Sequence, residues 1–291
     1  MHRFLRKNAV FLTLAALLFA AVFSLPRTLQ TAAVPKESSV RLPVVMYHHI
    51  CPDHTLAGPY VLPADVLEED FEFLQRSGYT PVSVRELLAY VTTGALLPEK
   101  PVLLTFDDGQ RSFLTRALPL LERYNFPAVV NVVGAFTDLY TENGDTNDRY
   151  ACLNADDLRA LSQHPLVEIG CHSYGMHTLG DRRGMGRKPG ESDDAYRAAL
   201  TADLARFNDR TSVLIGGQPR ILAYPFGIEN ELLRDLAAAN GFDVTLTCRE
   251  VVNTVRVGGA LTELGRFNRP YGIASEQFFS KFQETVAPKK E

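Results

Sequence analysis

"PVLLTFDDG", residues 101–109, joins a six-residue run to two adjacent aspartates and a glycine. The Val and Leu content of the run predicts a strand buried on both faces, which is typical of a parallel sheet. Two neighbouring carboxylates at the end of such a strand repel each other unless a partner neutralises one of them. A solvated Asp-Gly turn is the simpler alternative. Motifs elsewhere in the chain are needed to distinguish a solvated turn from a functional site.

Strand-like and helix-like patterns alternate on both sides of this run. Upstream, we expect a strand at 42–50, a helix at 63–78, and a strand at 80–84 whose end opens a helix with the capping box Ser83 and Glu86. Downstream, we expect strands at 127–133, 167–171, 220–226, 242–248 and 261–267, and helices at 113–124 (interrupted at Pro119), 154–161, 193–207, 230–241 and after Ser275. Seven or eight such units predict an α/β fold, a (β/α)7–8 barrel with its chemistry at the C-terminal strand ends. A doubly wound sheet is the alternative.

The N-terminus differs from the rest of the chain. Three cations, Arg3, Arg6 and Lys7, precede an uncharged apolar run at residues 9–25. This order predicts that residues 1–33 are a secretion signal or, if uncleaved, a membrane anchor. Residues 34–41 are expected to be a flexible tether, and residues 42–291 the folded domain. The sequence therefore predicts an extracytoplasmic protein, secreted or held at the cytoplasmic membrane.

Charge and cysteine content exclude some function classes. Residues 1–33 hold four cations and no acid, so 26 Lys and Arg face 34 Asp and Glu in the rest of the chain. With that excess of acid and no basic patch, nucleic acid is not expected as a partner. The four cysteines are scattered without CxxC spacing and are expected to be buried or without a role: Cys51, Cys152, Cys171 and Cys248.

A second polar motif lies downstream in "EIGCHSYGMHTLG", where His172 and His177 are five residues apart. On a helix this spacing separates two side chains by roughly 140°, and on a straight strand it places them on opposite faces. The two imidazoles converge only if the chain turns between them, as Ser173 and Gly175 permit. One carboxylate and two imidazoles would leave positions open for water, as a catalytic zinc site requires. Two unrelated histidines are the alternative.

Together, "TFDDG" and "HSYGMH" resemble the motifs of the NodB-homology polysaccharide deacetylases, carbohydrate esterase family 4. "MYHHI" (46–50), "GYTPVSV" (78–84) and "LAYPFG" (222–227) are also similar to that family. The branch that acts on poly-N-acetylglucosamine looks nearest. The resemblance covers roughly residues 42–286 and implies a distorted β/α barrel.

The resemblance also implies roles for single residues. It assigns Asp108, His172 and His177 to a divalent metal, most simply zinc, with cobalt or nickel as alternatives. It assigns the general base to Asp107, which would take a proton from the attacking water. The motif "YPFG" implies that Phe226 and Tyr224 contact the oxyanion or the substrate, with the backbone N–H of Phe226 donating to the oxyanion.

Three features depart from the family pattern, and the first is that the chain has no Trp and therefore no Asp-Trp motif. Ala223 stands where the family often has an arginine that orients the base, and Arg266 or Arg269 could replace it, although an exposed strand-end arginine is the ordinary expectation. No histidine follows His177, so the late catalytic histidine of the family is absent. We therefore predict that His48, at the end of the first strand, lines the site and protonates the leaving amine. A strand-end histidine that only packs against or orients a neighbour is the alternative.

These observations predict a metal-dependent hydrolase that removes N-acetyl groups from an N-acetylglucosamine polymer, either an exopolysaccharide or peptidoglycan. Two alternatives stay open: a deacetylase-like module that binds glycan but turns over poorly, and an esterase of the same family that acts on O-acetyl groups. The expected partner is an acetylated glycan, with the membrane as a second partner if residues 1–33 are retained.

Overall fold

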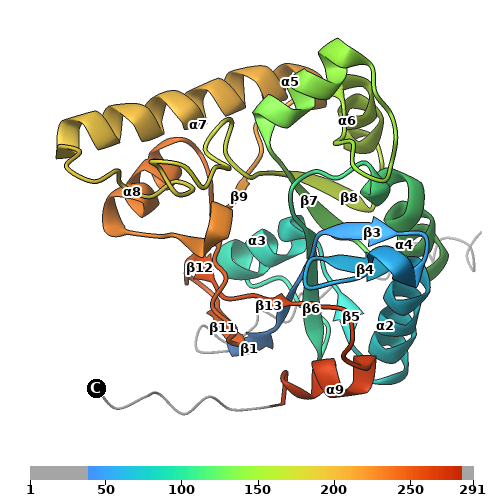
Figure 1. The fold of residues 1–291 in the computed structure, drawn as a ribbon. Coiled ribbons are helices and arrows are strands. Elements are labelled where there is room, and N and C mark those ends of the chain that lie inside the picture. Colours follow the sequence, from blue (N-terminus) through green and yellow to red (C-terminus); the bar gives the residue numbers. More distant parts are fainter. Residues whose placement is uncertain (1–38, 284–291) are drawn as a thin grey trace, which may run out of the picture. The chain divides into compact units, whose positions relative to one another are not determined.

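The structure is a computed structural model that describes residues 39–283, and the predicted signal or anchor lies outside this range. Its centre is a curled sheet in which eight parallel strands run in the order β12-β10-β9-β8-β7-β6-β2-β13, with β5 added beside β6 (Figure 1). The strands are β2 (Val44–Tyr47), β5 (Thr80–Pro81), β6 (Pro101–Phe106), β7 (Ala128–Val132), β8 (Val167–Cys171), β9 (Ile221–Ala223), β10 (Val244–Leu246), β12 (Leu261–Leu264) and β13 (Phe267–Asn268). Apart from β5 and β13, neighbours in the sheet follow chain order, and the predicted distorted β/α barrel is confirmed.

The barrel is open between β12 and β13, which stand at the two ends of this strand order. The prediction of a single strand at 261–267 was therefore wrong. The chain turns at Gly265, where a Cβ would lie 2.4 Å from Val251 Cγ2 and 2.5 Å from the carbonyl oxygen of Arg249. Only glycine permits this close approach, and the turn sends β13 to the far edge of the sheet beside β2.

The helices that follow the strands are α2 (Ala64–Arg76), α3 (Val84–Thr93), α4 (Leu118–Tyr124), α5 (Gly134–Asn143), α6 (Ala155–Ser162), α7 (Asp193–Ile215), α8 (Glu231–Ala239) and α9 (Ser275–Ser280). The predicted capping box is present, because Ser83 Oγ accepts from Glu86 N–H while the Glu86 carboxylate accepts from Ser83 N–H. The predicted helix at 113–124 begins instead as a π-helical turn, η2 (Phe113–Ala117). Pro119 then stands in the first turn of α4, where its missing N–H leaves no bond unmade.

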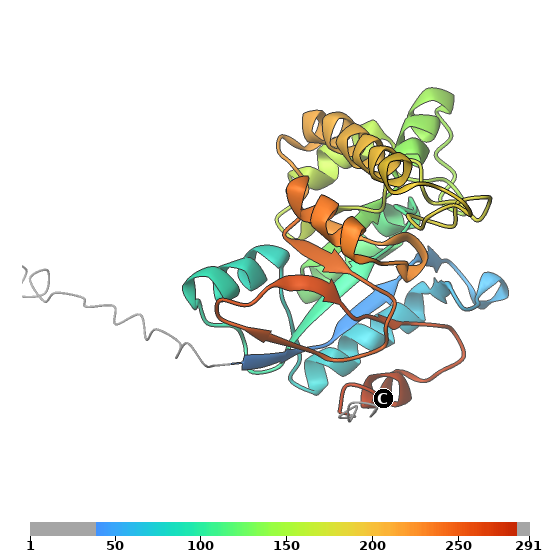
Figure 2. The same ribbon diagram turned by 90° about the vertical axis from the view of Figure 1, so that its left-hand side faces the viewer.

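Two apolar cores lie on the two faces of the sheet. In β6, Val102, Leu104 and Phe106 belong to the outer core, which α2, α4, α6, α7, α8 and α9 complete. Leu103 faces the inside of the curl and packs with α3. The members of this inner core in β2, β6 and β7 lie in the N-terminal half of each strand, and they are Val44, Leu103 and Val129. Inward-facing side chains at the C-terminal ends of these strands are left for a site. Figure 2 shows the helices arranged around the curled sheet.

Short elements complete the domain. Strand β1 (Ser39–Leu42) pairs antiparallel with β11 (Asn253–Arg256), so residues 39–41 are strand rather than the predicted tether. This pairing joins segments more than 200 residues apart, so no local sequence pattern predicts it. Strand β3 (His49–Cys51) pairs with β4 (Val61–Pro63), and the turn η1 (His54–Leu56) lies between them. Within residues 39–283, no helix is both long and apolar enough to cross a bilayer.

Candidate active site

The two aspartates stand where β6 leaves the sheet. Alternation along β6 points Leu103, Thr105 and Asp107 into the curl, and the Asp107 side chain is only 2% exposed. Asp108 has a φ of 68°, in the left-handed region that few residues other than glycine adopt. This turn brings Asp108 beside the same inner space, whereas an extended strand would send its side chain to the outer face. The strand end therefore presents both carboxylates to one site.

Asp107 is held by two donors. Its Oδ1 accepts hydrogen bonds from Arg266 Nη1 and from Asn131 Nδ2, each at 2.8 Å. Burial by itself raises the pKa of Asp107, but the Arg266 guanidinium and the nearby His172 more than offset burial, and the net pKa lies well below its ordinary value. Asp107 is therefore an oriented carboxylate at neutral pH, with its second oxygen, Oδ2, 3.9 Å from His172 Nε2.

Asp108, His172 and His177 form a triangle beside this carboxylate. Asp108 Oδ1 lies 3.6 Å from His172 Nε2 and 3.1 Å from His177 Nε2, and one ligand atom of each residue lies within 4.8 Å of the others. Asp108 Oδ1 is buried, and the part of the chain that the structure describes offers it no well-aligned hydrogen bond. The three residues that the sequence proposed as ligands are thus brought together.

The protonation states suit a cation. His172 Nδ1–H donates to the carbonyl oxygen of Ala223 at 2.8 Å, which leaves the lone pair of Nε2 facing the triangle. Burial lowers the pKa of His172, so its imidazole is neutral. Burial raises the pKa of Asp108, but His177 and His172 lower it below its ordinary value, so the carboxylate is ionised. Burial lowers the pKa of His177, but the Asp108 carboxylate raises it above its ordinary value, so His177 would give up a proton to bind a cation. One carboxylate, two imidazoles and a buried oxygen without a hydrogen bond fit a divalent cation.

The predicted turn between the two histidines is present. Ser173 has a φ of 69°, which reverses the chain after β8 and lets His177 return to His172. The Asp203 carboxylate, on α7, accepts hydrogen bonds from the backbone N–H groups of Tyr174 and Gly175, each at 2.8 Å. A helix that begins twenty residues later in the chain thus fixes the geometry of the turn.

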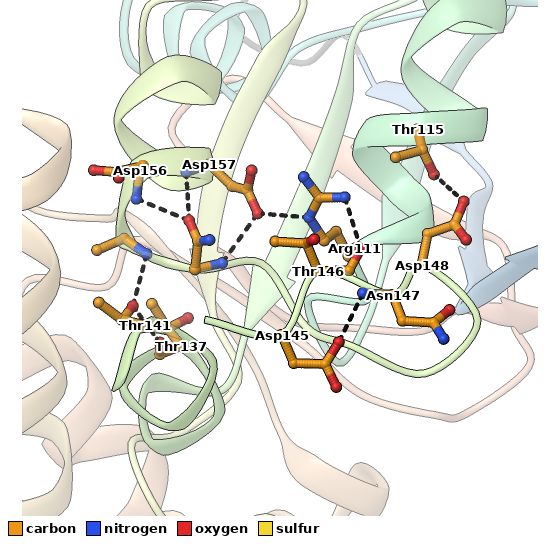
Figure 3. A network of polar contacts seen from close by, with 12 residues as sticks. Arg111, Thr115, Thr137, Thr141, Asp145, Thr146, Asn147, Asp148, Asp156 and Asp157 are labelled. Atoms are coloured by element: carbon orange, nitrogen blue, oxygen red, sulfur yellow. Dashed lines mark hydrogen bonds and ion pairs between the residues drawn. The ribbon is translucent and has the colours of Figure 1, made fainter. Parts of the chain in front are cut away.

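The backbone after the aspartates is held from outside the barrel. The carbonyl oxygen of Gly109 accepts from Leu153 N–H, and Arg111 N–H donates to the carbonyl oxygen of Ala151. The Arg111 side chain pairs with Asp157 at the start of α6 and donates to the carbonyl oxygen of Thr146 (Figure 3). These bonds fasten the long connection after α5 to the Asp-Asp-Gly turn.

A cavity of 570 Å³ opens over these groups. Its lining comes from the loops after several strands and comprises Met46, His48, Tyr60, Asp107, Asp108, His172, His177, Leu179, Arg183, Phe226, Cys248 and Asn268. His48 reaches it as predicted, with its ring edge-on to Tyr60 at 4.9 Å between ring centres. Burial lowers the pKa of His48, although Asp107 and Asp108 act in the opposite direction.

Of the other residues predicted at the site, some line the cavity or contact Asp107 and others do not. Phe226 lines the cavity with a φ of 59°, and its ring lies 4.7 Å from the His177 ring. Tyr224 is fully buried in the outer core and does not line the cavity, because alternation along β9 turns it away from the inward-facing Ala223. Arg266 and Arg269 are both buried, contrary to the expectation of an exposed strand-end arginine. Only Arg266 reaches Asp107, since Arg269 pairs with the buried Asp70 instead.

Sequence reasoning missed two features of the site. Asn131 interrupts the apolar run "AVVNVV", and that lone amide was the available signal for an inward-facing donor. Cys248 is exposed and lines the cavity, whereas we expected its side chain to be buried or without a role. Within residues 39–283 the other three cysteines are buried and all four are free thiols.

Comparisons with known proteins agree with this geometry. The family model described as polysaccharide deacetylase matches residues 95–245, about half of the chain. The chain belongs to the polysaccharide deacetylase family. A poly-beta-1,6-N-acetyl-D-glucosamine N-deacetylase of Escherichia coli K12 is 28% identical over 200 residues, which cover 62% of this chain and 30% of that relative. The matched region is thus less than a third of that relative's length.

Solved structures of deacetylases are also similar to this chain. A de-N-acetylase from Aggregatibacter actinomycetemcomitans superposes with a TM-score of 0.72 at 25% identity, over 84% of this chain and 98% of that chain. The BpsB deacetylase domain from Bordetella bronchiseptica is 26% identical, with a TM-score of 0.62 over 78% of this chain and 94% of that chain. The predicted resemblance to the NodB-homology deacetylases, nearest the poly-N-acetylglucosamine branch, is confirmed.

Proposed function

We propose that this deacetylase is a metal-dependent hydrolase that removes N-acetyl groups from a polymer containing N-acetylglucosamine. The observation that carries the proposal is the ionised, doubly held Asp107 beside the triangle of Asp108, His172 and His177. The names of the related proteins from Escherichia coli and Aggregatibacter support an acetamide as the bond that is broken.

Asp108, His172 and His177 would hold the cation, for which zinc, cobalt and nickel are all suitable. When bound, a divalent cation supplies Lewis acidity, which polarises the acyl oxygen and makes a water molecule more acidic. Asp107 takes the proton from the attacking water through Oδ2, since Oδ1 is occupied by Arg266 and Asn131. In this reaction the water oxygen joins the acyl carbon, the C–N bond breaks, and acetate and an amine are formed.

The leaving amine needs a proton and the oxyanion needs donors. His48 faces the same cavity as Asp107, and its Nδ1 is buried without a hydrogen bond to another described residue. We assign protonated His48 to proton donation toward the amine, since the described cavity lining has no other histidine outside the triangle. Burial lowers the pKa of His48, but the Asp107 and Asp108 charges oppose this effect and favour the protonated form. The Phe226 backbone, turned into the left-handed region beside His177, supplies the N–H for the oxyanion.

The cavity also suits a sugar chain. Its 570 Å³ lies within the range of small-molecule sites, and its rim carries exposed apolar side chains at Tyr60 and Leu179. Such surfaces can pack against the apolar face of a pyranose ring. These features favour a glycan over a small free amide as the substrate.

Acetate release tests the proposal. The zinc-loaded chain should release acetate from β-1,6-linked N-acetylglucosamine oligomers, and the Asp107→Asn variant should bind the same oligomers without releasing acetate. Binding without acetate release by the parent chain would favour the binding module. Faster release from acetylated xylan than from any N-acetylated glycan would favour the O-acetyl esterase.

We also propose an extracytoplasmic location, secreted or anchored, from the charge and hydropathy pattern of residues 1–33. Cell fractionation with N-terminal sequencing checks this proposal. Active protein in the cytosol with Met1 intact would contradict it.

A further inference from the structure

We propose that Arg183 selects substrates by charge, disfavouring a free amine on the sugar at the cavity rim and favouring neutral or anionic acyl groups. This inference rests on the proposed function and names the substrate class that the site prefers. Arg183 lines the cavity and is exposed, yet the interactions of the described residues include no acidic partner for it. Its guanidinium lies over the Phe226 ring, with 5.8 Å from Cζ to the ring centre. A charge without a counter-ion on a cavity wall is available to a ligand.

The position of Arg183 is built into the fold. Arg183 forms an antiparallel bridge with Leu179, and the next residue, Gly184, donates its N–H to the carbonyl oxygen of Thr178 at 2.9 Å. On the other side, the buried Arg182 pairs with Glu191. These contacts fix the backbone of the turn, so the guanidinium does not depend on a free loop for its placement.

A close approach locks this turn onto the Phe226 loop. Gly184 has a φ of 53°, and a Cβ at this position would lie 2.7 Å from the carbonyl oxygen of Pro225. The turn therefore packs directly against the backbone that carries Phe226, and Phe226 in turn packs on His177 at 4.7 Å. One aromatic ring, that of Phe226, therefore contacts both the Arg183 guanidinium and the His177 imidazole. Arg183 is thus held at the cavity wall, where it meets charges on a bound sugar.

Charge balance decides the direction of selection. Two carboxylates and two guanidinium groups belong to the site, and their formal charges cancel when the imidazoles are not counted: Asp107, Asp108, Arg183 and Arg266. A bound divalent cation would make the whole site positive. A protonated glucosamine amine is then repelled, whereas an intact acetamide is not. The product of each turnover carries such an amine, so the same charge weakens product binding.

Binding measurements separate this role from a structural one. The Asp107→Asn chain would be titrated by calorimetry, with and without zinc, against three tetramers of β-1,6-linked glucosamine. One tetramer is fully N-acetylated, one has a single free amine, and one has that amine N-succinylated. In the same background, Arg183→Gln should raise affinity for the amine tetramer roughly three- to tenfold and lower affinity for the succinylated one similarly, as expected for one unit charge at several ångströms. Affinity for the neutral tetramer should change less than twofold.

Matched variants complete the test. Arg197→Gln removes the same charge from the exposed surface of α7 and should leave all three affinities unchanged. Arg183→Lys should retain the charge preference, and 0.5 M salt should reduce it. Equal shifts for all three tetramers, or none, would overturn the role of Arg183. If the parent chain releases no acetate from the neutral tetramer, the proposed function fails; if it releases acetate but the charge series is flat, only the Arg183 inference fails.

Discussion

Gly170 offers the sharpest test of how the base is positioned. It stands beside Asn131 in the β7–β8 register, and a Cβ there would lie 2.1 Å from Asn131 Oδ1 and 2.6 Å from Ile221 Cγ2. Gly170→Ala therefore has to displace the amide whose Nδ2 donates to Asp107. Overpacking of this kind costs about 1–3 kcal/mol of unfolding free energy.

The effect on turnover follows from the lost hydrogen bond. A hydrogen bond to a charged group is worth about 1.5–3 kcal/mol, so its full loss in the transition state lowers kcat about 10- to 100-fold. Gly170→Ala and Asn131→Ala should both show this loss. Zinc content should stay unchanged in both, because neither residue belongs to the triangle of proposed ligands.

The Gly170→Ala/Asn131→Ala double variant distinguishes a collision between the added Cβ at position 170 and the Asn131 amide from a general destabilisation of strand β8. If Gly170→Ala acts through Asn131, Asn131→Ala removes most of the collision, although Ile221 remains as a second neighbour. Chemical denaturation should then give a double-variant loss at least about 1 kcal/mol smaller than the sum of the single losses. Turnover should stay low in the double variant. Additive losses within about 0.5 kcal/mol, or normal kcat in Gly170→Ala, would refute the reasoning.

Further outcomes follow from the site and the core. His172→Ala should lose most bound zinc by elemental analysis, while Asp107→Asn keeps zinc and loses turnover; full zinc occupancy in the first variant would contradict the ligand assignment. His48→Ala should lower acetamide hydrolysis roughly 100-fold and affect activated acetyl esters much less, and equal losses would exclude proton donation to the leaving group. Arg269→Met should lower the unfolding free energy by about 3–5 kcal/mol, because it leaves the buried Asp70 without its cation. A loss below about 1 kcal/mol in urea denaturation would show that Asp70 adapts.

Local sequence patterns were enough to predict much of the fold. The run at 101–106 has apolar residues on both faces, and this pattern alone predicts burial between two layers. The Ser83 and Glu86 capping box and the apolar spacing of α2 are complete within a few residues, so they needed no distant partner. The Asp107–Asp108 and His172–His177 motifs were recognisable for the same reason, since each is formed by one strand end and its turn.

Only the tertiary structure decided which distant groups meet at Asp107. Arg266 is 159 residues away in the sequence and reaches Asp107 because Gly265 lets the chain turn between β12 and β13. Alternation in a strand tells which residues share a face, but it does not say which face looks inward until the sheet curls and its neighbours are known. The resemblance in "YPFG" placed Tyr224 at the site without this information, while Asn131, on the inward face of β7, was overlooked. Short-range hydrophobic periodicity thus determined most of the elements, and the polar residues at two strand ends identified the two motifs. Long-range strand order determined which donors orient Asp107.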